Sequence, residues 1–179
     1  MRYLALLRGI NVGGNNLISM TELRRCFEDI GLQNVATYIQ SGNVLFQTSA
    51  RDRTRLAAKI ESALTQRFGY TALIGLVSED QLASVVQDAP EDFGSDPGKC
   101  RYDVIFLRPP VQAREVLPTL RLKEGVDEAF ASDHVLYCSR LISKASQSHF
   151  PKLISHPAYK SMTIRNWNTT SRLRKLMQE

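Results

Sequence analysis

The chain has 179 residues, of which 43% are hydrophobic and 23% are charged. This composition is ordinary for a globular protein and argues against disorder. No apolar run approaches the roughly 20 residues that a membrane span needs, and the apolar core of Met1–Arg8 is too short for a signal peptide. The length allows one large domain or two small ones. We therefore expect a globular protein that has no membrane partner.

The cysteines and histidines show no pattern of a metal or catalytic site. Cys26, Cys100 and Cys138 are odd in number and lack metal-ligand spacing, which is typical of free thiols in a reducing compartment. The sequence therefore predicts a cytoplasmic protein. The histidines provide no third metal ligand, and no motif positions a Ser-His-Asp or Cys-His arrangement. We expect no metal and no cofactor, and whether the protein is an enzyme stays open.

The net charge of +5 is unevenly distributed along the chain. Residues 139–179 hold eight Lys or Arg and one acid, a net charge of +7, which leaves −2 for the first 138 residues. A basic C-terminal region favours an acidic partner such as phosphate, a nucleotide or nucleic acid. A solvated basic helix face explains the same excess of charge, so both interpretations remain.

Residues 1–89 alternate between helical and strand periodicity. The elements expected there are a strand over 3–7, a helix over 20–30, strands over 35–39 and 44–46, a helix over 53–67, a strand over 70–77 and a short helix over 78–86. Capping boxes at Ser19–Glu22 and Ser78–Gln81 begin two of the helices, and Gly31 ends the first. The order strand, helix, strand, strand, helix, strand is that of the split βαβ, or ferredoxin-like, unit.

The same order returns after an acidic, turn-forming stretch over 90–100, which we interpret as a linker. The elements expected beyond it are a strand over 102–107, a helix over 111–120, strands over 126–131 and 134–138, a helix over 147–155, a strand over 161–164 and a helix over 168–177. The sequence thus predicts an α+β fold of two ferredoxin-like subdomains related by duplication, with an extra C-terminal helix. Residues 1–89 form the first subdomain and its short helix, and residues 101–179 form the second subdomain and the C-terminal helix.

Two polar loops are expected at one end of the first sheet. In the split βαβ unit, the loop after the first strand and the hairpin between the second and third strands share an end of the sheet. Exposed backbone N–H groups in such loops can cradle an anion. The candidate ligand-binding residues here are Arg8, Gly9, Asn11, Gly13, Gly14, Asn16, Gln40, Ser41, Gly42 and Asn43, with Asn15 in the same loop. The alternative is that the glycines only permit a tight turn, since neither a Walker A nor a dinucleotide-binding spacing is present.

A second polar cluster lies at the start of the last helix. Arg165 can hold a phosphate through two hydrogen bonds, Trp167 can stack on a ring, and a helix N-terminus favours an anion. The candidates in this half are Ser143, Lys144, Arg165, Asn166, Trp167, Asn168 and Thr169. The alternative is structural, with Asn168 or Thr169 capping the helix and Trp167 packed in the core.

Three sequence blocks resemble a known family. Residues 8–14, 38–43 and 163–169 resemble, in order and spacing, the signature blocks of the family catalogued as domain of unknown function 1697. The resemblance covers essentially the whole chain and implies two ferredoxin-like subdomains arranged as a duplication, but no established activity. Members of that family often carry a Gly-x-x-x-Ser-Lys-Leu stretch between the hairpin of the second repeat and its next helix. Residues 139–145 of this chain keep its Ser143 and Lys144 but lack the glycine and the leucine.

These patterns favour a binding protein for a small anionic ligand, phosphorylated or nucleotide-like, in a cleft lined by the Gly/Asn loops and Arg165. The alternative is an RNA-binding protein, since ferredoxin-like sheets carry RNA in the RRM family. Residues 44–47 and 134–138 offer only one aromatic side chain each, which makes RNA the second choice. A third possibility is a phosphoryl- or nucleotidyl-transferring enzyme in which Lys144 and Arg165 stabilise charge. The site blocks contain no carboxylate for acid–base catalysis.

Overall fold

The computed structural model describes residues 1–14 and 16–179, so Asn15 of the predicted glycine- and asparagine-rich loop lies outside the described residues. The chain forms two compact units. The first comprises Met1–Leu82 with Met177–Glu179, and the second comprises Ala83–Leu176. The division falls within helix α3 (Glu79–Gln87), whereas the sequence analysis placed it after residue 89. None of the helices in the described part of the chain has both the length and the apolar character for crossing a membrane.

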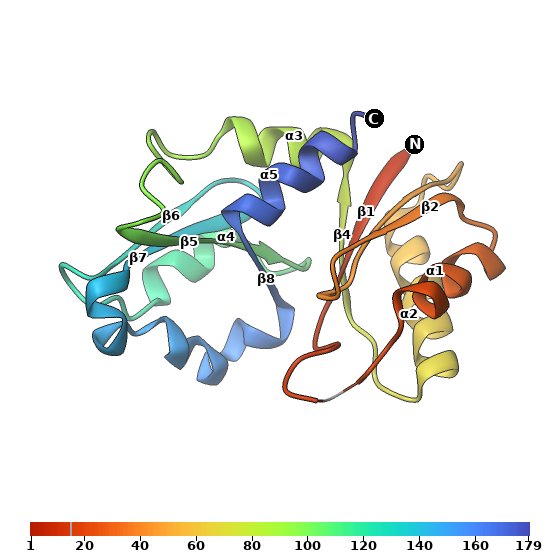
Figure 1. The fold of residues 1–179 in the computed structure, drawn as a ribbon, viewed down its shortest axis with the longest axis horizontal. Helices are drawn as coiled ribbons and strands as arrows, with labels where there is room; N and C mark the ends of the chain where they lie inside the picture. Colours follow the sequence, from red (N-terminus) through yellow and green to blue (C-terminus); the bar gives the residue numbers. More distant parts are fainter. Residues whose placement is uncertain (15) are drawn as a thin grey trace. The chain divides into compact units, whose positions relative to one another are not determined.

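The first unit is a four-stranded antiparallel sheet with two helices on one face (Figure 1). Its elements are β1 (Arg2–Leu7), α1 (Met20–Asp29), β2 (Gln33–Tyr38), β3 (Asn43–Gln47), α2 (Arg53–Phe68) and β4 (Ile74–Ser78). The strand order is β2-β3-β1-β4. The faces of α1 and α2 that carry Leu23, Phe27, Ile60 and Leu64 pack on alternate residues of the strands, as the helical and period-two patterns require.

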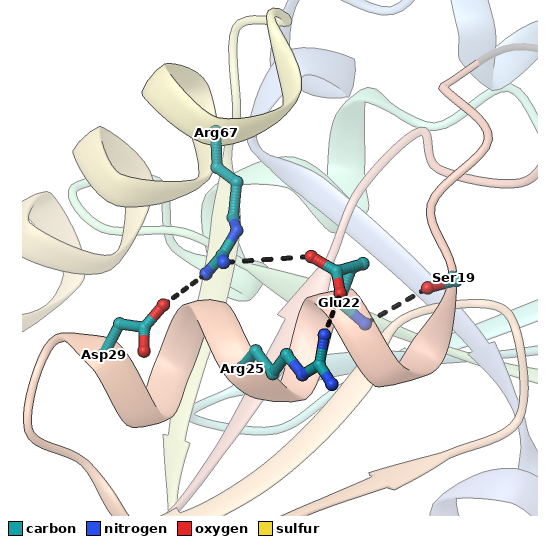
Figure 2. Close-up of polar contacts among 5 residues, drawn as sticks. All are labelled: Ser19, Glu22, Arg25, Asp29 and Arg67. Carbon is teal, nitrogen blue, oxygen red and sulfur yellow. Dashed lines mark hydrogen bonds and ion pairs between the residues drawn. The ribbon is translucent and has the colours of Figure 1, made fainter.

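An arginine joins the two helices of the first unit. In Figure 2, Arg67 of α2 lies between two carboxylates of α1, 2.7 Å from Asp29 and 3.8 Å from Glu22. Glu22 also pairs with Arg25 at 2.8 Å, and its backbone N–H donates to the Ser19 hydroxyl at 3.1 Å. The predicted N-cap is therefore confirmed. Glu22, in the same first turn of α1, also forms the ion pair with Arg67 that links α1 to α2.

The second unit repeats the strand order with a different helical cover. Its sheet has the order β6-β7-β5-β8, again antiparallel throughout. Its elements are β5 (Cys100–Leu107), α4 (Ala113–Val116), η1 (Leu117–Thr119), β6 (Asp127–Ala131), β7 (Val135–Leu141), η2 (Ile142–Gln147), η3 (Phe150–Ser155), η4 (Pro157–Ser161), β8 (Met162–Asn166) and α5 (Trp167–Leu176), where η marks a 3₁₀ helix. The predicted α+β class with two repeated subdomains is confirmed.

The helices predicted over 111–120 and 147–155 were wrong in type and length. The first is a four-residue α-helix followed by η1, because Pro118 has no backbone N–H to continue the hydrogen bonds of the α-helix. The second is replaced by η2, η3 and η4, since Pro151 and Pro157 lack an N–H and restart the helical turns. Figure 1 shows α3 and α5 on one side of the second sheet and the 3₁₀ segments on the other.

The stretch predicted as a linker packs against the second unit. Phe93 makes edge-to-face contacts with Tyr102, Tyr137 and Trp167 at ring-centroid distances of 5.0, 5.4 and 5.2 Å. Gly94 lies so close to Trp167 that an added Cβ would stand 2.1 Å from its Cδ1 atom. A substitution at Gly94 would therefore displace the tryptophan.

Tyr70 gives the first unit a specific response to alkaline pH. Its hydroxyl is buried and has no hydrogen-bond partner among the described residues. Burial, with the nearby Cys26 as a lesser cause, raises the pKa of Tyr70 to about 12. The unfolded chain has a tyrosine pKa of about 10, so the folded state holds the proton more tightly. This contribution to stability is complete below pH 10 and is lost as the pH rises toward 12.

We expect Tyr70→Phe to raise the free energy of unfolding at pH 7 by about 1 kcal/mol, because it removes an unpaired buried hydroxyl. It should also reduce the loss of stability between pH 10 and pH 12. Urea unfolding monitored by circular dichroism at both ends of this range measures both effects. An equal loss in the variant and the parent chain would contradict the role given to Tyr70.

Candidate functional site

The two polar loops of the first unit are neighbours, as the topology of the unit predicts. The side-chain amide of Asn11 donates to the backbone oxygens of Ile18 at 3.0 Å and of Gln40 at 2.9 Å, and its oxygen accepts from the Ile18 N–H at 2.8 Å. Asn11 adopts φ 52°, a left-handed conformation that asparagine tolerates better than most residues. One side chain thus closes its own loop and joins it to the hairpin.

Asn16 and Asn43 make similar internal contacts. Asn16 donates to the Gly9 carbonyl at 2.8 Å. Asn43 is fully buried and donates to the Tyr38 carbonyl at 2.9 Å and to the Ser41 hydroxyl at 3.1 Å. The asparagine side chains at these positions therefore stabilise the loop backbone through hydrogen bonds.

Gly42 is required for close packing of the hairpin against the first loop. It has φ 77°, and an added Cβ would stand 2.6 Å from Ile10 and 2.8 Å from Leu7. The glycines Gly9, Gly13 and Gly14 also have positive φ and are exposed, as is Gln40, while Arg8 is half-buried. The structure therefore brings the ten candidates of the first unit together around one loop pair.

The candidates of the second unit lie at the end of the sheet where β5 begins and β7 and β8 end. Ser143 and Lys144 are exposed in η2, directly after β7. Asn166 is the last residue of β8, and its side chain accepts the Thr169 N–H at 2.8 Å. Asn166 therefore caps α5, whereas the structural alternative drawn from the sequence gave this role to Asn168 or Thr169.

Arg165 lies within β8 and is 9% exposed, although the sequence analysis placed it after the strand. It pairs with Val104, whereas Asn166 pairs with Asp103. Since successive strand residues alternate between faces, Arg165 and Asn166 point to opposite sides of the sheet. Its guanidinium donates to the Ile164 carbonyl at 2.9 Å, and burial lowers the pKa of Arg165 to about 10, so it stays charged at pH 7.

A pocket of about 490 Å³ lies at this end of the second sheet, and we call it the end pocket. Its lining residues come from the stretch after α3, from β5, from β7 and the turn after it, and from the first turn of α5: Gly94, Pro97, Cys100, Arg101, Tyr102, Arg140, Ile142, Ala145, Asn166, Trp167 and Asn168. Of the sequence candidates, Asn166, Trp167 and Asn168 line it. Arg165, Ser143, Lys144 and Thr169 do not.

Arg101 and Arg140 are the charged residues of the end pocket that the sequence analysis missed. They stand directly opposite each other in the β5–β7 pairing, and like charges in this position destabilise a sheet. Arg101 pairs with Asp103 at 3.1 Å. Burial raises the pKa of Asp103, and the two arginines oppose that shift. A pair of isolated arginines 39 positions apart carries no sequence signal until the strand register is known.

Arg140 is the less compensated of the two arginines. Its guanidinium has no hydrogen bond or close ion pair within the described ranges, beyond its electrostatic attraction to Asp103. The end pocket therefore presents a cationic wall beside the first turn of α5. An anion is the ligand that such a wall favours, and no three of His, Cys, Asp or Glu within residues 1–14 and 16–179 are grouped to hold a metal ion.

We expect Asn11→Asp to lower the free energy of unfolding by about 1–3 kcal/mol, because a carboxylate cannot donate to the two carbonyls that Asn11 joins. Asn34→Asp is the matched control, since Asn34 also has a positive φ of 49° but makes one exposed side-chain bond to Gln47. Equal urea midpoints for the two variants would contradict the bracing role.

We expect Arg165→Ala to lower the free energy of unfolding without any ligand by about 1–3 kcal/mol, because it deletes a buried side chain and its hydrogen bond. Lys175→Ala on the exposed surface of α5 is the control. If the two variants unfold at the same denaturant concentration, Arg165 has no structural role and a role confined to ligand contact is favoured.

Comparison with known proteins supports the fold. The conserved bacterial protein SP0830 from Streptococcus pneumoniae has a similar structure, with a TM-score of 0.84 and 26% sequence identity over 98% of each chain. No curated protein matches the chain. The family model described as "Protein of unknown function (DUF1697)" matches residues 1–137. The blocks over 8–14 and 38–43 lie within this match, the predicted family is confirmed, and the chain belongs to it.

Proposed function

We propose that the second unit binds a small anionic ligand, phosphorylated or nucleotide-like, in the end pocket. The observation that carries this proposal is the pair of arginines, Arg101 and Arg140, directly opposite each other in the sheet and both lining the pocket. Without an anion, their mutual repulsion costs stability, which Asp103 offsets through its ion pair with Arg101 and its electrostatic attraction to Arg140. A phosphate between the arginines turns this repulsion into two charge-assisted interactions.

The first turn of α5 adds to the attraction for an anion. The pocket is lined by Asn166, Trp167 and Asn168, and α5 is ten residues long. The N-terminal end of such a helix carries partial positive charge and backbone N–H groups. Asn166 occupies the N–H of Thr169, which leaves the earlier positions of the turn for a ligand.

Trp167 supplies a surface for a planar ring. Phe93 packs edge-to-face against it at 5.2 Å, and Gly94 lies against its Cδ1 and Nε1 atoms. The indole is therefore held in place while it also lines the pocket. A rigid aromatic beside two arginines favours a nucleotide-like ligand over a bare phosphate, because stacking on a base adds about 1–3 kcal/mol.

The proposal changes the set of ligand contacts drawn from the sequence. Arg165 lies on the opposite face of the sheet from the end pocket, and Asn11 and Asn43 brace the loops of the first unit. Asn166, Trp167 and Asn168 remain, and Arg101 and Arg140 are added. The free thiols of Cys26, Cys100 and Cys138 accord with a reducing compartment, so the cytoplasmic location stays a prediction.

We expect AMP to raise the melting temperature of the parent chain and not that of Arg140→Ala. Without ligand, Arg140→Ala should be as stable as the parent chain or up to about 1 kcal/mol more stable, because the like-charge pair is gone. Differential scanning fluorimetry with and without AMP measures both properties. Lys175→Ala, which removes a cation from the far end of α5, should respond to AMP as the parent chain does.

Further ligands separate the possible identities of the anion. Adenosine tests stacking alone, and inorganic phosphate tests charge alone. A U-rich oligonucleotide that binds far more tightly than AMP, with a steep dependence on salt, would favour the RNA-binding alternative. Retained AMP stabilisation in Arg140→Ala, or an unliganded Arg140→Ala that is markedly less stable, would overturn the proposal.

A further inference from the structure

The helical cover of the second sheet leaves a second pocket, which we call the flank pocket. It has a volume of about 620 Å³ and lies between the segment that includes α4 and η1 and the segment that includes η3 and η4. In the first unit the corresponding face is filled by the full-length helices α1 and α2. The short turns forced by Pro118, Pro151 and Pro157 cover the second sheet less completely.

The floor of the flank pocket is apolar. Val116 and Leu153 are buried members of the core of the second unit. Leu120 and Phe150 pack against that core, and Leu122 also lines the pocket. Apolar walls with a few polar groups, in a volume of several hundred Å³, are typical of sites for small organic molecules.

The rim of the flank pocket is cationic. Arg121 and Lys152 are exposed, and neither side chain has a hydrogen-bond or ion-pair partner within the described part of the chain. Glu115 is the one acidic residue among those that line the pocket. The rim therefore favours an anionic head group, while the floor favours an apolar body.

A chain of hydrogen bonds spans the flank pocket and holds its two walls together. His156 Nδ1 accepts from the Ala158 N–H at 3.1 Å, so the proton of the neutral ring is on Nε2. Nε2 lies 2.9 Å from the Thr119 hydroxyl, which donates to the Val116 carbonyl at 2.6 Å. The chain links η4 to η1 and α4. The pocket is thus formed before a ligand arrives, which lowers the entropic cost of binding.

We propose that the flank pocket binds a medium-length aliphatic carboxylate, with its chain on the apolar floor and its carboxylate between Arg121 and Lys152. This site shares no residue with the end pocket, so it is independent of the proposed function. A phosphorylated polar ligand fits the end pocket, whereas the flank pocket lacks the paired arginines and the tryptophan.

The test uses octanoate as the probe, titrated into the full chain by calorimetry below its micelle concentration. We expect saturable binding of one octanoate per chain. Shortening the probe to hexanoate and butyrate should weaken binding about fourfold for each methylene removed, because each buried methylene contributes about 0.8 kcal/mol. Octanol should bind more weakly than octanoate, because it lacks the charge. Added salt should reduce this difference in affinity, because it screens the attraction between the carboxylate and the two cations.

Two variants and one control locate the site. Ser155→Trp places a large side chain at an exposed position on the rim and should weaken octanoate binding at least tenfold. Ser146→Trp, at an exposed position of η2 outside the flank pocket, is the matched control and should bind as the parent chain does. The combined change Arg121→Ala with Lys152→Ala should weaken octanoate binding three- to tenfold and leave octanol binding unchanged.

Several results would overturn this inference. One is the absence of saturable octanoate binding to a chain that is folded by circular dichroism. Another is equal binding by Ser155→Trp and Ser146→Trp. A third is equal loss of octanoate and octanol binding when the two cations are removed, since the head group would then have no part in recognition. If Ser155→Trp does not fold, octanoate and octanol binding by the Arg121→Ala with Lys152→Ala variant is the deciding measurement.

Discussion

The position of β5 between β7 and β8 is the constraint on which the candidate chemistry of the second unit depends. Antiparallel pairing places Arg101 opposite Arg140, and Arg165 opposite Val104. Because side chains alternate along a strand, the first pair reaches the end pocket and Arg165 lies on the other face. A shift of one residue in either register would exchange these positions. The cationic wall is thus a product of strand pairing.

The same strand order in the two units gives different surfaces, because the covering segments differ. Full helices on the first sheet fill the space above it with side chains such as Leu23, Phe27 and Leu64. Prolines in the second unit break the cover into 3₁₀ turns. Loss of regular helices usually exposes core side chains to water. Here the His156–Thr119 bridge holds the shorter segments in place and leaves a bounded pocket.

The glycine- and asparagine-rich loop shows how a polar motif can serve the fold. Its Asn11 and Asn16 donate side-chain amide groups to backbone carbonyls, as Asn11 does to those of Ile18 and Gln40. Buried or constrained carbonyls without partners are costly, so amide side chains that donate to them stabilise the loop. The polarity and glycine content of a loop do not by themselves distinguish bracing of the backbone from anion binding, since both functions use amide N–H groups.

The sequence by itself determined the α+β class, the repeated strand order, most element boundaries, the cap at Ser19 and the family. These features depend on local periodicity, capping chemistry and motif spacing, which neighbouring residues encode. Helix type over residues 142–161, the buried position of Arg165 and the meeting of Arg101 with Arg140 were decided only by the tertiary structure. Each depends on strand register or on the packing of residues distant in the chain, and no local pattern carries that information.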